Sequence, residues 1–156
     1  MTLALLFACS SEATDAPVAV EPQPIELSEC GVCGMTVGEQ PAPRAQLQDR
    51  DGHVHFCSIG DLRAFLSAPS PRGEALGIWV EALPPDYDAT GRDSAPQPWV
   101  PAEQATFVVG FERGSVMGLP VLSYAEEGHA DQAAKTVEGH TTDWSTLKAT
   151  SFDKVP

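Results

Sequence analysis

The chain has 156 residues, of which 42% are hydrophobic and 20% are charged, and this composition is typical of one globular domain with an ordinary core. Its net charge is −13, and only nine residues are Lys or Arg. Nucleic-acid phosphates are bound by clustered basic side chains, so this composition argues against a nucleic-acid partner. An acidic surface attracts cations and basic patches of other proteins, or serves solubility alone.

The N-terminal residues predict a lipid-anchored protein of the bacterial cell envelope. The short apolar segment 1–8 leads into Leu6-Phe7-Ala8-Cys9, which resembles a lipobox whose cysteine receives acyl chains. This signal segment is too short to span a bilayer and lacks a basic start, so we expect it to be truncated at its N-terminus. Residues 9–27, rich in proline and small residues, predict a disordered, flexible tether.

From these features we expect Cys9 to be the lipidated residue. We also expect the protein to face the periplasm, anchored in the outer membrane. The alternative is an unrelated hydrophobic start followed by a free cysteine.

The pattern after the tether predicts strand, strand, helix and strand. Residues 44–49 and 53–57 alternate apolar with polar positions around Asp51-Gly52, which predicts a β-hairpin with a polar outer face. Ser58 is a suitable N-cap for a helix over residues 59–66, which carries Asp61 in its first turn. Residues 76–83 predict the next strand.

The remaining residues repeat this order. Residues 84–101, with five prolines, predict a polar loop that is ordered only where Tyr87 and Trp99 dock. Strands are expected over residues 105–109 and 116–122, a helix over 130–137 and a last strand over 144–147. The fold class that follows is α+β, with two strand-strand-helix-strand halves and a mostly antiparallel sheet, in one domain over residues 28–156.

The segment Cys30-Gly-Val-Cys33-Gly-Met35 brings two thiols and a thioether into six residues. Thiolate and thioether are soft ligands, which favour Cu(I) over hard cations. The same Cys-x-x-Cys pattern is also found in redox pairs, in half-sites for zinc and in local disulfides, and a methionine there can simply fill the core. The segment alone leaves these alternatives open.

Other candidate ligands are scattered along the chain. With Cys9 assigned to lipid, the third thiol is Cys57, and Met117 lies in a glycine-containing turn. His129 at the start of a predicted helix is a further candidate, as are His53 and His55, which share one face of the hairpin. Three cysteines and a histidine would also satisfy zinc.

No known catalytic motif is found in the sequence, which contains no Gly-x-Ser-x-Gly elbow, no phosphate-binding loop and no His-Glu-x-x-His. A thioredoxin-like site needs a buried strand before its Cys-x-x-Cys and a long helix after it, and neither flank of Cys30–Met35 fits. We therefore expect no enzyme activity.

Several of these segments together resemble the NosL family of copper-chaperone lipoproteins of nitrous oxide reductase assembly. The resemblance extends from about residue 28 to 137. It is carried by the lipobox at Cys9, the Cys33-Gly-Met35 motif, the hairpin 45–56 with the helix start at 59–62, and residues 109–118 with Gly-Ser-Val-Met-Gly. The two methionine motifs together are more specific than either alone.

The resemblance implies two halves of strand-strand-helix-strand character and one Cu(I), held by sulfur for delivery to the copper sites of the reductase. It implies that Cys33, Met35 and Met117 are ligands. Cys30 and Cys57 depart from the pattern common in the family, so the ligand set stays open between these residues and His129.

We therefore predict a lipid-anchored Cu(I) carrier that passes its metal to a periplasmic cuproenzyme or assembly factor, with the nitrous oxide reductase maturation machinery as the expected partner. The alternatives are an envelope thiol–disulfide oxidoreductase that uses Cys30 and Cys33, and a structural zinc-binding lipoprotein.

Overall fold

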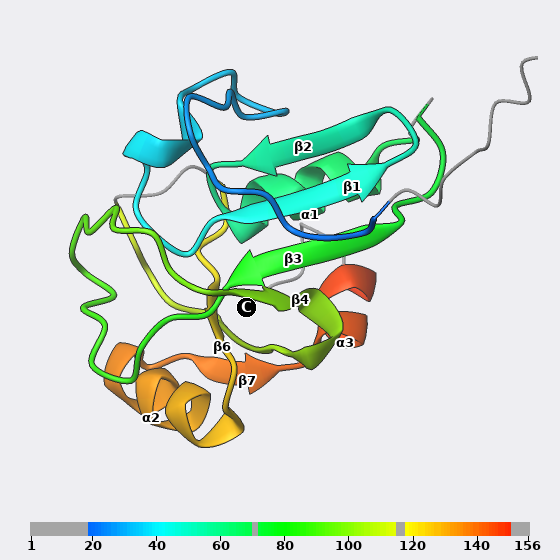
Figure 1. Cartoon of the computed structure of the whole chain (residues 1–156). Helices are drawn as coiled ribbons and strands as arrows, with labels where there is room; N and C mark the ends of the chain where they lie inside the picture. Colours follow the sequence, from blue (N-terminus) through cyan, green and yellow to red (C-terminus); the bar gives the residue numbers. More distant parts are fainter. Residues whose placement is uncertain (1–18, 70–71, 115–117, 151–156) are drawn as a thin grey trace, which may run out of the picture.

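The structure is a computed structural model that describes residues 19–69, 72–114 and 118–150 (Figure 1). Within them the chain forms two consecutive units of strand, strand, helix and strand, which confirms the expected fold class. None of the helices in these residues is long and apolar enough to cross a lipid bilayer. The first unit consists of β1 (Ala45–Asp49), β2 (Gly52–Phe56), α1 (Ile59–Ser67) and β3 (Gly77–Glu81). The 3-10 helix η1 (Val37–Glu39) precedes it, and β4 (Trp99–Pro101) and the 3-10 helix η2 (Ala102–Gln104) follow it. The second unit consists of β5 (Thr106–Val109), β6 (Leu122–Tyr124), α2 (Glu127–Val137) and β7 (His140–Thr142), and the helix α3 (Trp144–Ala149) follows it.

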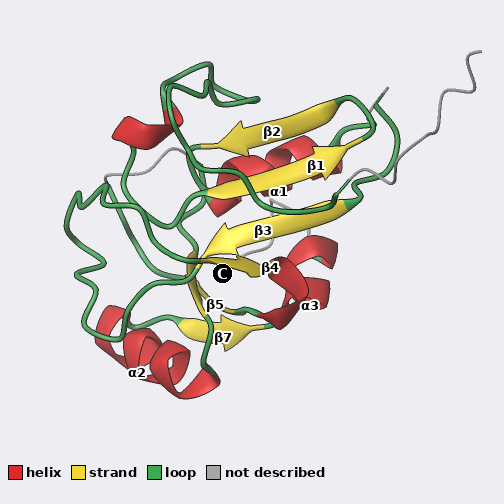
Figure 2. Cartoon of the chain, in the orientation of Figure 1, coloured by secondary structure: helices red, strands yellow, loops and turns green. Residues whose placement is uncertain are grey.

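The two units have the same strand arrangement. The first sheet has the order β2-β1-β3-β4 and the second has the order β6-β5-β7, with every pair of neighbours antiparallel. The first strand of each unit therefore lies between its second and third strands. Figure 2 shows α1 behind the first sheet and α2 beside the second.

The hairpin forms around the expected turn. Ala45 pairs with Phe56 and Asp49 with Gly52, and Gly52 adopts a φ of 120°, a backbone conformation that favours glycine. Asp51 N donates to the side chain of Asp49 at 2.8 Å, which closes the turn.

The outer face of this hairpin differs from the prediction, because it is covered rather than solvated. Gln46 is fully buried, and its side-chain amide donates to and accepts from the backbone of Gln23 at 2.8 Å each. Gln48 donates to Ala19 O at 3.1 Å, and His53 Nε2 lies 2.9 Å from Glu21 O. Residues 19–25, expected to belong to the flexible tether, thus run across the first sheet (Figure 1).

Helix α1 begins where the sequence predicts. The Ser58 hydroxyl accepts from Asp61 N at 3.0 Å and caps the helix, and Ile59 and Leu62 are fully buried beneath the sheet. This cap sets the direction in which the chain leaves β2, and so it places Asp61 beside the end of that strand.

Two predicted strands in the second unit were wrong. The strand expected over residues 116–122 is instead β6, which begins only at Leu122, and positions 116 and 117 lie outside the described residues. The strand expected over residues 144–147 is the start of α3. The Asp143 carboxylate accepts from Thr146 N at 2.7 Å as an N-cap, and Trp144 and Leu147 are buried at helical spacing.

The proline-rich loop after β3 ends in a strand that the sequence did not predict. Trp99 pairs with Glu81, and Val100 pairs with Val80, which makes β4 the edge of the first sheet. Tyr87 docks as expected, since its hydroxyl donates to Ala42 O at 2.8 Å.

A buried ion pair connects the first sheet to the loops around it. Both Arg44 and Glu81 are 1% exposed, and the guanidinium donates to the two carboxylate oxygens at 2.8 and 2.7 Å. The other guanidinium N–H groups donate to the carbonyl oxygens of Gly38, Gln40, Ser94 and Ala95. One charged group thus orders two long loops.

The two units are joined at the end of β3. The Ser123 hydroxyl of β6 donates to Glu81 O at 2.6 Å, and Leu83 N donates to Ser123 O at 2.9 Å. The main core is shared, because Phe56 and Leu62 of the first unit lie in the same cluster as Phe107 and Trp144.

The variant Glu81→Gln tests the ion pair. Removing one partner leaves the Arg44 charge buried and uncompensated, which costs about 3–5 kcal/mol. We expect the free energy of unfolding, measured with urea, to fall by that amount. Glu103→Gln makes the same change at an exposed position and should stay within about 0.5 kcal/mol of the parent. Equal effects of the two variants would contradict the assignment.

Candidate metal centre

The loop that carries Cys30 and Cys33 is closed by its own backbone. Cys30 N donates to Met35 O at 2.8 Å, and Gly34 N donates to Cys30 O at 3.0 Å. Gly34 has a φ of 73°, which favours glycine at this turn. Gly31 N donates to His55 O at 2.9 Å, so the loop is fastened to β2.

Glycine is also needed at position 31 for packing. A Cβ there would lie 2.5 Å from Val54 Cγ1, closer than two carbon atoms can approach. The close contact lets the thiol loop lie against the hairpin, and this brings Cys30 and Cys33 to the end of β2.

Three thiols and one carboxylate converge at this point. Cys57 directly follows β2, Asp61 belongs to the first turn of α1, and the ligand atoms of Cys30, Cys33, Cys57 and Asp61 all lie within 4.8 Å of one another. We call these four residues the thiol cluster. Cys33 Sγ lies 3.5 Å from Cys57 Sγ, and the Cys30 thiol lies 3.7 Å from Asp61 Oδ2. All three cysteines are free thiols.

The cluster has a buried side and an accessible side. Cys30, Cys57 and Asp61 are 4%, 3% and 5% exposed, whereas Cys33 is half-buried. Cys57 N donates to Cys30 Sγ at 3.4 Å, a contact that orients the inner sulfur. A metal ion or a partner therefore meets Cys33 first.

Burial shapes the proton chemistry of the cluster. It raises the pKa of the Cys57 thiol far above the usual thiol range. Burial also raises the pKa of Cys33, although a backbone hydrogen bond from Met35 opposes it. The pKa of Asp61 is raised by burial and lowered by hydrogen bonds from Cys30 and Ser58, with the increase larger. Cys33 and Cys57 are therefore protonated at neutral pH in the metal-free protein, so metal binding must release protons.

The predicted ligands fall into two groups. The structure brings Cys30, Cys33 and Cys57 together, and it adds Asp61, which the sequence analysis treated only as a favourable charge in the first turn of a helix. Its spacing from Cys57 gave no helical signal, because Cys57 precedes the Ser58 cap and lies outside the helix, so the sequence offered no local pattern for this ligand. The side chain of Met35 is half-buried and packs against the main core.

Two predicted residues, Cys9 and Met117, lie outside the described residues. The chain just after Met117 is close to the cluster. A Cβ on Gly118 would lie 3.8 Å from Asp61 Oδ1, and a Cβ on Gly60 would lie 2.5 Å from Leu119 O. Residues 118–119 therefore pack on the first turn of α1.

Among the described residues, no histidine side chain contributes to the thiol cluster, although the backbone of His55 holds the thiol loop. His129 is in the first turn of α2, where its Nε2 lies 3.7 Å from a carboxylate oxygen of Glu126. His53 is occupied with Glu21 O and stacks on Trp79, with ring centroids 6.3 Å apart. Within residues 19–69, 72–114 and 118–150 the cluster is the one group of three or more potential ligands, and no histidine belongs to it.

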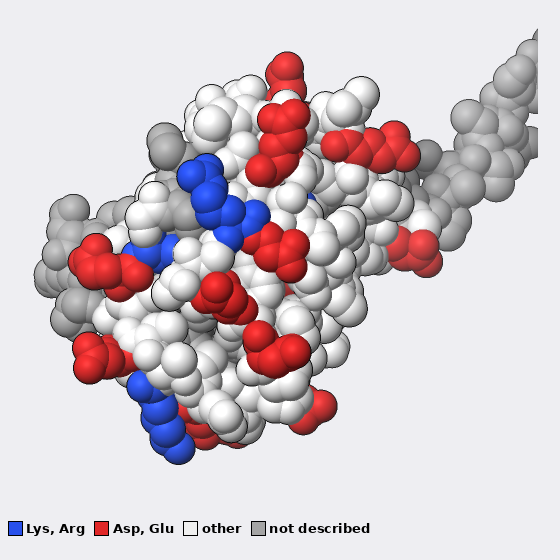
Figure 3. All heavy atoms as spheres, turned by 90° about the vertical axis from the view of Figure 1, so that its left-hand side faces the viewer, with Lys and Arg blue, Asp and Glu red and all other residues white. Residues whose placement is uncertain are grey.

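Two large apolar side chains are exposed in the thiol loop and in the segment that leads to it. Val32, between the two cysteines of the loop, is 46% exposed, and Leu27 is 89% exposed. Acidic side chains are spread over the face seen in Figure 3, whereas basic ones occupy fewer places.

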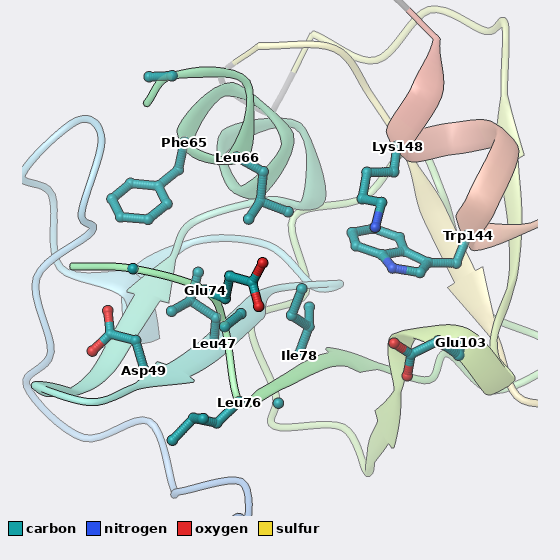
Figure 4. Close-up of a pocket in the computed structure, with 14 residues that line it drawn as sticks. Leu47, Asp49, Phe65, Leu66, Glu74, Leu76, Ile78, Glu103, Trp144 and Lys148 are labelled. Atoms are coloured by element: carbon teal, nitrogen blue, oxygen red, sulfur yellow. The ribbon is translucent and has the colours of Figure 1, made fainter. Parts of the chain in front are cut away.

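A separate pocket of about 680 Å³ lies between α1, the first sheet and α3 (Figure 4). Leu47, Leu66, Ile78 and Trp144 form its apolar floor and walls. Of the described residues that line it, none is Cys, His or Ser, and its Asp49 is paired with Arg72. Its other charged side chains are Glu74, Glu103 and Lys148, so its described lining contains no soft metal ligand.

Comparison with known proteins assigns a family. The sequence model described as NosL matches residues 22–152. The copper-binding lipoprotein NosL of Stutzerimonas stutzeri is 29% identical over 118 residues, which cover 73% of this chain and 56% of that protein. The protein of the same name from Achromobacter cycloclastes is 30% identical over 123 residues, which cover 76% and 61%. The chain thus spans about three fifths of the length of these relatives.

The fold agrees with this assignment. The crystal structure of the copper chaperone NosL from Shewanella denitrificans superposes with a TM-score of 0.70 at 24% identity, covering 85% of this chain and 99% of that one. The family match spans most of the chain, including the thiol loop, the hairpin and both units. The chain therefore belongs to the NosL family.

Proposed function

We propose that this protein is a metallochaperone of the bacterial cell envelope that binds Cu(I) through sulfur and delivers it to a periplasmic cuproenzyme. The observation that carries the proposal is the half-buried Cys33 thiol, 3.5 Å from the buried Cys57 thiol, at the outer edge of a cluster of soft ligands. Relatives named copper-binding lipoprotein and copper chaperone support it.

The chemistry of the donors favours Cu(I). Thiolates and thioethers are soft, and Cu(I) accepts low coordination numbers with such ligands. The central ligand in this proposal is Cys33, with Met35 and Met117 as thioether donors and Cys57 as a second thiolate. Gly118, the residue after Met117 in the sequence, lies beside Asp61.

Transfer then proceeds by ligand exchange and needs no catalytic residue. Because Cys33 is the accessible thiol, the ligands of a partner displace it first and the buried sulfurs last. The exposed Val32 offers apolar contact beside Cys33, and the net charge of −13 favours a partner with a basic surface. The proposed acceptor is the assembly machinery of nitrous oxide reductase.

Cysteine variants test the copper site. We expect Cys33→Ser to lose most Cu(I) affinity and Cys57→Ser to lose less, while Cys30→Ser keeps most of it. The reason is that the Cys30 thiol is buried and already engaged with Asp61 and Cys57 N. The measurement is anaerobic Cu(I) titration against a competing chelator, with reductant present. If Cys30→Ser and Cys33→Ser lose copper equally, and both lose thiol–disulfide exchange activity, an oxidoreductase is the better description.

The methionines are tested by leucine, which keeps the volume and removes the sulfur. Met35→Leu and Met117→Leu should each weaken Cu(I) binding by roughly tenfold. The metal-free variants should unfold within about 1.5 kcal/mol of the parent, so that lost packing does not explain the effect. Parent-like copper affinity in both variants would remove the thioethers from the site.

We also propose that Cys9 is lipidated and anchors the protein to the membrane. The support is the Leu6-Phe7-Ala8-Cys9 segment together with relatives named lipoproteins. Mass spectrometry of the protein extracted from membranes should find acyl chains on Cys9, and Cys9→Ser should move the protein to the soluble fraction. An unmodified Cys9 would refute the anchor and leave the copper site standing.

A further inference from the structure

We propose that Cys30, Cys33, Cys57 and Asp61 together form a tetrahedral site for a borderline divalent cation of the zinc type. This site uses a carboxylate that Cu(I) does not require, and it shares its thiols with the copper site. It is argued from the geometry of the thiol cluster and holds whether or not the protein delivers copper.

The distances match the edges of a tetrahedron around zinc. With Zn–S bonds of about 2.3 Å and Zn–O bonds of about 2.0 Å, neighbouring ligand atoms lie about 3.5–3.8 Å apart. The Cys33 and Cys57 sulfurs are 3.5 Å apart, the Cys30 sulfur and Asp61 Oδ2 are 3.7 Å apart, and no pair exceeds 4.8 Å. Only small shifts would therefore place all four atoms around one ion.

Asp61 is the residue that distinguishes the two metals. Asp61 is 5% exposed, and within the described part of the chain the groups that bond to its carboxylate, the Cys30 thiol and the Ser58 hydroxyl, carry no positive charge. A buried carboxylate without a cationic partner is costly, and a divalent ion would supply that partner. Zinc binds thiolate and carboxylate in the same site, whereas Cu(I) selects the soft donors.

The four residues belong to three separate segments of the chain, which a metal ion bound to all four would hold together. The thiol loop supplies two ligands, the residue after β2 supplies one, and α1 supplies the last. A bound divalent ion would lock the loop to the junction of β2 and α1 and stabilise the fold. Since both metals need Cys33, the chain cannot hold them in the same place at once, and the divalent ion occupies the cluster when Cu(I) is absent.

The first experiment uses the reduced, metal-free full chain and needs no variant. Co2+ replaces zinc as a spectroscopic probe, because tetrahedral Co2+ has intense visible bands and thiolate ligands add charge-transfer absorption. We expect one Co2+ per chain with both features, displaced by one Zn2+. Octahedral Co2+ spectra, or no saturable Zn2+ binding, would overturn the proposal.

The second experiment compares Asp61→Asn with Met35→Leu. Asp61→Asn should weaken Zn2+ binding by roughly tenfold or more and leave Cu(I) affinity nearly unchanged. Met35→Leu should do the reverse. The control Glu29→Gln, an exposed acid beside the thiol loop, should change neither affinity. Zn2+ affinity that is unaffected by Asp61→Asn overturns this inference alone, whereas Cu(I) affinity unaffected by every sulfur variant overturns the proposed function alone.

Discussion

The ion pair between Arg44 and Glu81 is the interaction on which the arrangement of the rest of the chain depends. It lies at the start of β1 and the end of β3, and both side chains are 1% exposed. A buried charge must have its partners, so the guanidinium collects the carbonyls of the loops on either side of it. The backbone of Glu81 accepts from Ser123, so the same position also joins the second sheet to the first.

The first sheet, held in this way, determines the position of the thiol cluster. The register of β1 and β2 fixes where β2 ends, and therefore where Cys57 lies. The Ser58 cap then turns the chain into α1 and brings Asp61 back toward Cys57, while Gly31 N holds the thiol loop to His55 O. The ligands are thus carried by a strand end, a helix start and a fastened loop, and such rigid supports keep a metal site preorganised.

The depth of the four donors underlies both of the metal sites proposed for the cluster. Cys33 and the exposed Val32 are at the surface, where a partner can exchange ligands, whereas Cys30 and Asp61 lie beneath. In the proposed copper site, a soft monovalent ion is held by sulfur donors that include the accessible Cys33, where a partner begins the exchange. A divalent ion needs the inner carboxylate as well and is held more completely. The acidic surface raises the local concentration of either cation.

The sequence by itself determined the hairpin at Asp51-Gly52, the Ser58 cap, the two α+β halves and the three thiols, because each depends on neighbouring residues or on a short motif. The helix at Trp144 was missed because it has only six residues, so the Asp143 cap and one i, i+3 apolar pair were its main signals. The buried glutamines of β1 depend on contacts with residues 19–25, more than twenty positions away. Only the tertiary structure brought Asp61 into the cluster, because the convergence of a loop, a strand end and a helix start is set by packing between distant segments and leaves no local pattern in the chain.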